Sequence, residues 1–132
     1  MKITNKQVRD FVLGVGNNGL AKKRLPVKIG YAISRNLNNM DGILNSYEDA
    51  RQKLIDQYAE KNKDGTMKIK DNVAVIAPEN SKAFSEAIDE LLAIENEIDI
   101  HTINFDEVEK CDTDKYDSLT TADLLTLDIM IN

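Results

Sequence analysis

A stripe of residues spaced alternately by four and three runs through residues 33–58, and it constrains the fold more than any other feature of the sequence. That spacing brings side chains to one face of an α-helix and is typical of helices that pack together at a shallow angle. We therefore predict a long helix over residues 26–61, with Pro26 in its first turn, where a missing N–H costs nothing. All positions of the stripe but Arg51 are uncharged, and its members are Ile33, Leu37, Met40, Leu44, Tyr47, Arg51, Leu54 and Tyr58.

A helix of that length would be about 50 Å long at 1.5 Å per residue, and it would overhang a compact domain of 132 residues. Part of its stripe therefore needs another partner. A second amphipathic helix is predicted over residues 81–97, which gives an antiparallel helical hairpin with a β-hairpin over 66–77 at its turn. The stripe also suits self-association, and we expect a homodimer or a larger assembly.

Shorter elements complete the prediction of a single domain over residues 1–132. A short helix is expected over 4–16, capped by Thr4 or Asn5. Residues 98–103 alternate with period two, as a half-buried strand does, and an acidic loop follows over 106–117. A capping-box-like start at Thr120 opens a C-terminal helix over 120–129. The fold class is α+β, mainly α.

Charge and hydropathy exclude two classes of partner. The formal net charge is −6 and the pI is near 4.8, whereas a nucleic-acid-binding protein normally carries a basic face. No segment approaches the roughly 20 apolar residues of a membrane span. The N-terminal residues lack the apolar run of a signal peptide, and a single cysteine, Cys111, fits a reducing compartment. We expect a cytoplasmic protein that binds neither nucleic acid nor membrane.

The run GVGNNG at residues 14–19 matches the G-x-G-x-x-G pattern of dinucleotide-binding loops. Such a loop needs a buried strand before it and a helix N-terminus after it. Here the residues before it space their apolar side chains like a helix, and Pro26 interrupts any helix that follows within two turns. We interpret the run as the end of the short N-terminal helix, with Gly16 or Gly19 in left-handed C-cap geometry.

Candidate chemical groups are few. His101 is the only histidine, and it lies on the outer face of the predicted strand. Cys111 is the obvious nucleophile to pair with it, but acidic neighbours raise a thiol's pKa and so do not activate it. The aspartates of 112–117 lack the central glycine and the closing glutamate of a calcium loop. We therefore assign no catalytic, cofactor or metal residue and do not expect an enzyme.

Basic residues cluster immediately before and at the start of the long helix. Such a cluster suits a phosphate or an acidic partner, and the alternative is a solvated loop. The candidate interaction residues are Lys22, Lys23, Arg24, Lys28, Arg35 and Arg51.

Several runs resemble a family of small phage and prophage proteins of Gram-positive hosts whose function is unknown. They are LPVKIGYAISRNL (25–37), YEDAR (47–51), YAEK (58–61), EIDIH (97–101) and the closing segment 119–131. The resemblance implies a cytoplasmic protein made in an infected or lysogenic bacterium. It implies no active-site residue.

The function expected from these observations is protein–protein binding by a phage-encoded accessory protein that inhibits or modulates a host process, such as a defence system. An acidic protein is electrostatically suited to a basic nucleic-acid-binding surface on a host effector. Two alternatives stay open: a structural or assembly role in the virion, and a sponge for a nucleotide signal with its anion site at residues 22–28.

Overall fold

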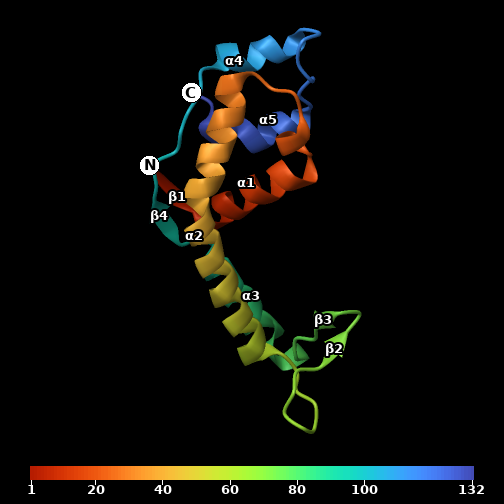
Figure 1. Cartoon of the computed structure of the whole chain (residues 1–132). Coiled ribbons are helices and arrows are strands. Elements are labelled where there is room, and N and C mark those ends of the chain that lie inside the picture. The colour runs from red at the N-terminus through yellow and green to blue at the C-terminus, as the bar shows by residue number, and fades with distance from the viewer.

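The longest element of the computed structural model, which describes residues 1–132, is helix α2. Its 32 residues span about 48 Å. Other elements enclose its first half in a head, and its second half projects from the head as one side of an arm (Figure 1). The elements in chain order are β1 (Lys2–Thr4), α1 (Asn5–Asn17), α2 (Val27–Tyr58), β2 (Ile69–Lys70), β3 (Val73–Ala74), α3 (Ser81–Leu92), β4 (Glu95–Glu97), α4 (Phe105–Glu109) and α5 (Thr121–Leu127).

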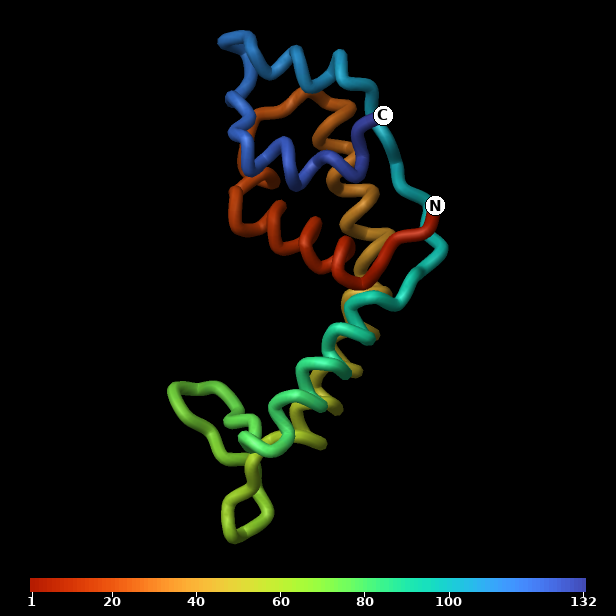
Figure 2. Tube along the Cα trace, turned by 180° about the vertical axis from the view of Figure 1, so that it is seen from behind, coloured from red at the N-terminus to blue at the C-terminus, as the bar shows by residue number.

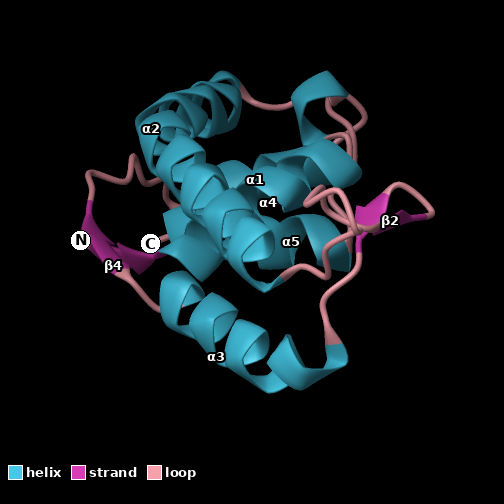
Figure 3. Cartoon of the chain, turned by 90° about the horizontal axis from the view of Figure 1, so that it is seen from below, coloured by secondary structure: helices cyan, strands magenta, loops and turns pink.

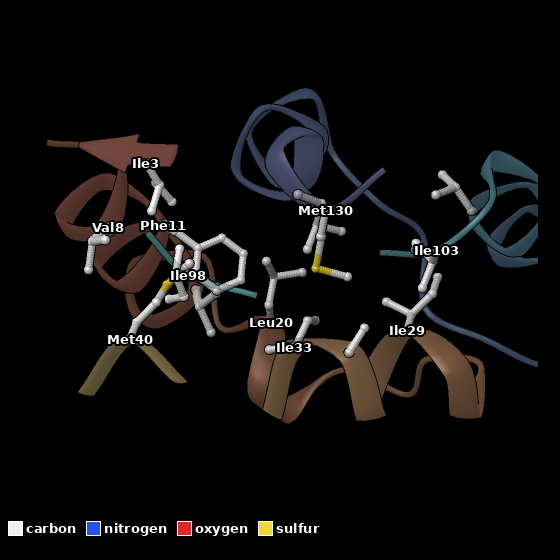
Figure 4. Packing of buried hydrophobic residues seen from close by; sticks show 14 of the residues in the cluster. Ile3, Val8, Phe11, Leu20, Ile29, Ile33, Met40, Ile98, Ile103 and Met130 are labelled. Carbon is white, nitrogen blue, oxygen red and sulfur yellow. The ribbon is translucent and has the colours of Figure 1, made fainter. Parts of the chain in front are cut away.

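The hydrophobic core lies entirely in the head. Fifteen buried residues form one cluster. They come from β1, α1, the loop before α2, the first half of α2, the extended segment after β4, α4 and the turn after it, and the C-terminal residues from α5 onward. Phe11 and Leu20, from the N-terminal part of the chain, and Met130, from its C-terminal part, pack in the same cluster as Ile33 on α2 (Figure 4). The head therefore joins residues from both ends of the chain around the N-terminal half of one helix.

The arm is an antiparallel pair made by α3 and the second half of α2 (Figures 2 and 3). At its far end the rings of Tyr58 and Phe84 meet edge to face with centroids 6.1 Å apart. The hairpin of β2 and β3 closes this end. Asp71 and Asn72 form its turn with φ of 52° and 65°, as a two-residue type I′ turn requires. The predicted mainly α fold and the pairing of the two helices around a β-hairpin are confirmed.

Two predicted boundaries are wrong around residues 93–103. The helix predicted over 81–97 ends at Leu92, because the chain then turns into β4 and pairs antiparallel with β1. The strand predicted over 98–103 is an extended segment without a partner strand along most of its length. Only Ile103 bridges another segment, in parallel to Ile131. The long helix likewise ends at Tyr58 instead of 61, because Ala59 and Lys61 pair with the hairpin.

Helices α1 and α5 each begin directly after a threonine that caps the N-terminus. Thr4 caps α1 and forms a capping box with Gln7, and Thr120 does the same for α5 with Asp123. The predicted acidic loop over 106–117 instead begins with a helical turn, α4, whose Val108 is buried in the core. In the glycine run, α1 continues through Gly16 to Asn17, and Gly19 takes the left-handed conformation with φ of 67°.

Candidate interaction surfaces

The stripe of α2 packs within the chain. Ile33, Met40 and Tyr47 are buried, and the first two belong to the core of the head. Leu37 and Leu44 are partly buried against that core. The last two positions, Leu54 and Tyr58, are partly buried in the arm. The fold therefore covers both halves of the stripe with different elements of the same chain.

The basic cluster faces α4, α5 and the segment between them. The Lys23 ammonium donates to Asp123 Oδ2 at 2.7 Å and to the Ser118 carbonyl at 3.0 Å. Asp123 is only 1% exposed. Its burial would raise the pKa of its carboxyl, but the Lys23 ammonium and hydrogen bonds from Thr120 outweigh burial and lower that pKa. This ion pair ties the loop before α2 to the start of α5.

The neighbouring cations are paired in the same way. Asp117 accepts hydrogen bonds from the backbone N–H of Arg24 at 2.7 Å and from its guanidinium. The backbone hydrogen bond is the main reason that the pKa of Asp117 is lowered. Lys28 lies 3.7 Å from Glu107. The acidic segment after residue 104 thus neutralises most of the basic cluster.

The other three predicted interaction residues lie apart from these pairs. Arg35 donates to the Tyr31 hydroxyl at 3.3 Å. Arg51 lies 3.8 Å from Glu48, one turn before it on the arm. Lys22 is exposed and has no carboxylate within salt-bridge distance. The six cations therefore do not form one surface.

The two candidate chemical groups occupy different environments. Cys111 is buried in the core of the head, and burial followed by the Asp112 charge raises the pKa of its thiol. His101 is exposed and its ring meets Tyr31 edge to face, with centroids 5.2 Å apart. No group of three or more His, Cys, Asp or Glu side chains converges as a metal site would.

The arm helices carry most of the net negative charge of the chain. Residues 41–58 and 81–92 hold seven carboxylates against three cations, a net charge of −4 of the total −6. All seven carboxylates are exposed, and they are Asp41, Glu48, Asp49, Asp56, Glu86, Asp89 and Glu90. The head contains more acidic residues in number, but its cations balance most of them. The unbalanced charge therefore lies on the part of the molecule that projects into solvent.

Five of the seven carboxylates on the arm helices have no ion pair. Glu48 pairs with Arg51, and Glu86 lies 4.0 Å from Lys82. The unpaired group is Asp41, Asp49, Asp56, Asp89 and Glu90, which we call the arm carboxylates. Its three members on α2 are separated by eight and seven residues, so they recur at roughly 10–12 Å along one side of the helix.

Comparisons with known proteins give no further guide. No protein-family model, curated protein or solved structure matches this chain. None of its helices is long and apolar enough to cross a membrane.

Inspection of single motifs missed the arm carboxylates, because they form no motif. Two signals in the sequence point to them together. The stripe predicts a helix longer than the domain, and Asp41, Asp49 and Asp56 occur in the part of it that must overhang. The basic cluster, in contrast, stood out in the sequence but proves to be half of a set of internal ion pairs.

Proposed function

We propose that this chain is a phage-encoded accessory protein that acts in the bacterial cytoplasm by binding a host protein, and that the arm carboxylates dock on a basic surface of that partner. The observation that carries the proposal is the location of the charge. Four of the six net negative charges lie on two projecting helices. A nucleic-acid-binding surface on a host effector, such as a defence protein, has the complementary charge.

The arm is suited to such docking in shape as well as in charge. It stands clear of the head, so a partner can approach α2 and α3 without disturbing the main core (Figure 1). Unpaired surface carboxylates raise the rate of association with a basic partner by long-range attraction, and added salt weakens that attraction. The binding is therefore expected to be fast and salt-sensitive.

The test is affinity capture from a lysate of the bacterial host with two matched variants. In the arm variant, the five arm carboxylates become amides (Asp41→Asn, Asp49→Asn, Asp56→Asn, Asp89→Asn, Glu90→Gln). In the head variant, five head carboxylates without an ion pair change in the same way (Asp106→Asn, Glu109→Gln, Asp112→Asn, Asp114→Asn, Asp128→Asn). Both variants lose the same charge.

We expect the wild-type chain and the head variant to retain the same host protein, and the arm variant to lose it. The captured protein should lose its own nucleic acid when the wild-type chain binds. Equal loss in both variants would reduce the effect to net charge and contradict docking through the arm. Mass spectrometry of purified virions tests the alternative role, because stoichiometric incorporation would indicate an assembly protein.

A further inference from the structure

A hollow of about 420 Å³ lies where α4 and the extended segment after β4 meet the start of α2. Helix α4 lies against that end of α2 (Figure 1). The volume is at the lower end of the range for small-molecule sites, so the hollow suits a ligand of few heavy atoms. Its lining includes Val27, Lys28, Tyr31, His101, Thr102 and Glu107.

One wall of the hollow carries a buried carboxylate. Glu107 is only 8% exposed, and Lys110 donates to both of its oxygens at 3.0 Å. A carboxylate has about four acceptor positions. The Lys28 ammonium lies 3.7 Å from Glu107 Oε1, which is beyond hydrogen-bond distance. Acceptor positions of this nearly buried anion are therefore left without a donor, although burial makes a donor valuable to it.

The second charged group of the lining is the Lys28 ammonium. This side chain is 77% exposed and makes no hydrogen bond within the chain. The hollow thus presents one anion and one cation 3.7 Å apart, and neither charge has its full set of close partners. A ligand that carries both signs on neighbouring atoms is complementary to such a pair.

The remaining lining is aromatic and apolar, and it is held in place. The rings of Tyr31 and His101 meet edge to face with centroids 5.2 Å apart. Asn36, which is completely buried, accepts from the His101 N–H at 2.7 Å and donates to the His101 carbonyl at 3.0 Å. Val27 is nevertheless 86% exposed and Tyr31 53%. Covering these side chains with an apolar group would be favourable.

We propose that the hollow binds a free amino acid with an apolar or aromatic side chain. Its ammonium would donate to the open acceptor positions of Glu107, and its carboxylate would pair with Lys28. Both groups of such a ligand are attached to one carbon atom, which suits two protein charges that lie 3.7 Å apart. The ligand side chain would cover Val27 and the ring of Tyr31. This surface is distinct from the arm, so the inference does not depend on the proposed function.

Ligands with a single charge match the hollow less well. A simple anion that approaches Lys28 also approaches the Glu107 carboxylate, and a simple cation that approaches Glu107 also approaches the Lys28 ammonium. Such like-charge contacts oppose binding. A zwitterion pairs with both groups and leaves the local charge unchanged.

The test is NMR titration of the wild-type chain with free phenylalanine, tyrosine, leucine and methionine, each at up to about 10 mM. We expect at least one of them to shift the amide signals of Val27, Thr102 and Glu107. The tightest ligand is then compared with its analogues that lack the carboxylate or the ammonium, which for phenylalanine are phenethylamine and phenylpropanoate. Each analogue should bind at least about tenfold more weakly, the loss of one charge-assisted hydrogen bond.

Failure of all four amino acids to shift these amides overturns the proposal. An analogue that binds as tightly as the amino acid also overturns it. In that case the hollow is a site for a simple anion or a simple cation.

Four variants, each checked for folding by circular dichroism, assign the two charges. Lys28→Ala and Glu107→Gln should each weaken binding about tenfold. Lys22→Ala removes an exposed lysine outside the hollow, and Glu109→Gln removes an exposed carboxylate from the same helix as Glu107. These two controls should bind within about twofold of wild type.

The Lys28→Ala variant also gives a readout that does not require Glu107→Gln to fold. In this variant the amino acid and its analogue without a carboxylate should bind within about twofold of each other, because the carboxylate has lost its partner. A preference for the amino acid as large as in wild type would show that Lys28 does not receive the carboxylate and would overturn the proposal.

Discussion

Substitution of Gly14 by alanine tests how closely α1 and α5 approach each other. A Cβ atom at Gly14 would overlap Thr126 Oγ1 and would lie 2.8 Å from Thr126 Cγ2. At Gly16, two residues further along the same helix, a Cβ would meet nothing within 4 Å. Both glycines lie in α1. The pair therefore separates the effect of crowding from the effect of helix propensity.

Each substitution removes a glycine from a helix, which alone is favourable by up to about 1 kcal/mol. Crowding at Gly14 should cost about 1–3 kcal/mol, because α1 and α5 must separate or Thr126 must leave its position. Gly16→Ala should therefore be as stable as wild type or more stable, and Gly14→Ala should be less stable than Gly16→Ala by about 1–3 kcal/mol. Urea unfolding followed by circular dichroism measures both free energies.

A double mutant adds the decisive control. Thr126→Ala removes the two closest atoms and leaves only Cβ, 3.1 Å from the new methyl group. The cost of Gly14→Ala should then fall by about 1 kcal/mol or more, as expected for residues in direct contact. If Gly14→Ala is as stable as Gly16→Ala, or if Thr126→Ala leaves its cost unchanged, the close approach of α1 and α5 is refuted.

Three further predictions concern buried polar groups and the hairpin turn. The lowered pKa of Asp123 stabilises the fold; this stabilisation is complete above the unfolded-state pKa of about 4 and is lost as the pH falls through the folded pKa. In a plot of the free energy of urea unfolding against pH, Asp123→Asn should therefore weaken the fall in stability at acid pH. An unchanged fall would contradict the ion pair with Lys23. Asn36→Leu leaves the N–H and C=O of His101 unpaired and should cost about 2–3 kcal/mol, with faster hydrogen exchange at the His101 amide; exchange at the wild-type rate would contradict the anchoring role of Asn36. Asn72→Gly relieves a positive φ of 65° in the hairpin turn and should raise stability by a few tenths of a kcal/mol, seen as slower exchange of the β2 and β3 amides and contradicted by faster exchange there.

Local periodicity predicted the helical part of the fold because it needs no knowledge of distant residues. The spacing of Leu44, Tyr47, Leu54 and Tyr58 predicts a helix and a partner for it, and α3 provides that partner. The pairing of β1 with β4 was missed for the opposite reason. Residues 2–4 are too few to show a period, and their partners lie more than ninety positions away in the chain. That pairing also shortened the predicted helix over 81–97.

The charged residues show the same contrast between what a local pattern predicts and what depends on distant residues. Lys23 and Arg24 were conspicuous as a basic run, but their partners Asp123 and Asp117 follow about a hundred residues later. Their pairing depends on the loop before α2 lying against the segment before α5, which no local pattern encodes. The glycine run was correctly interpreted as the end of a helix, but the contact that requires Gly14 is made by Thr126 on α5, which no local pattern encodes.

The distribution of ion pairs links the fold to the proposed binding surface. In the head, Lys23, Arg24 and Lys28 are taken up by carboxylates of the C-terminal third. Those cations are consequently not free to balance charge elsewhere, and the arm has only three cations for seven carboxylates. Removing charge from the head pairs should lower stability, because Asp123 is buried and its loss leaves Lys23 without its carboxylate. Removing charge from the exposed arm should leave stability nearly unchanged or raise it by relieving repulsion, so folding and the proposed partner binding should depend on different carboxylates of one acidic chain.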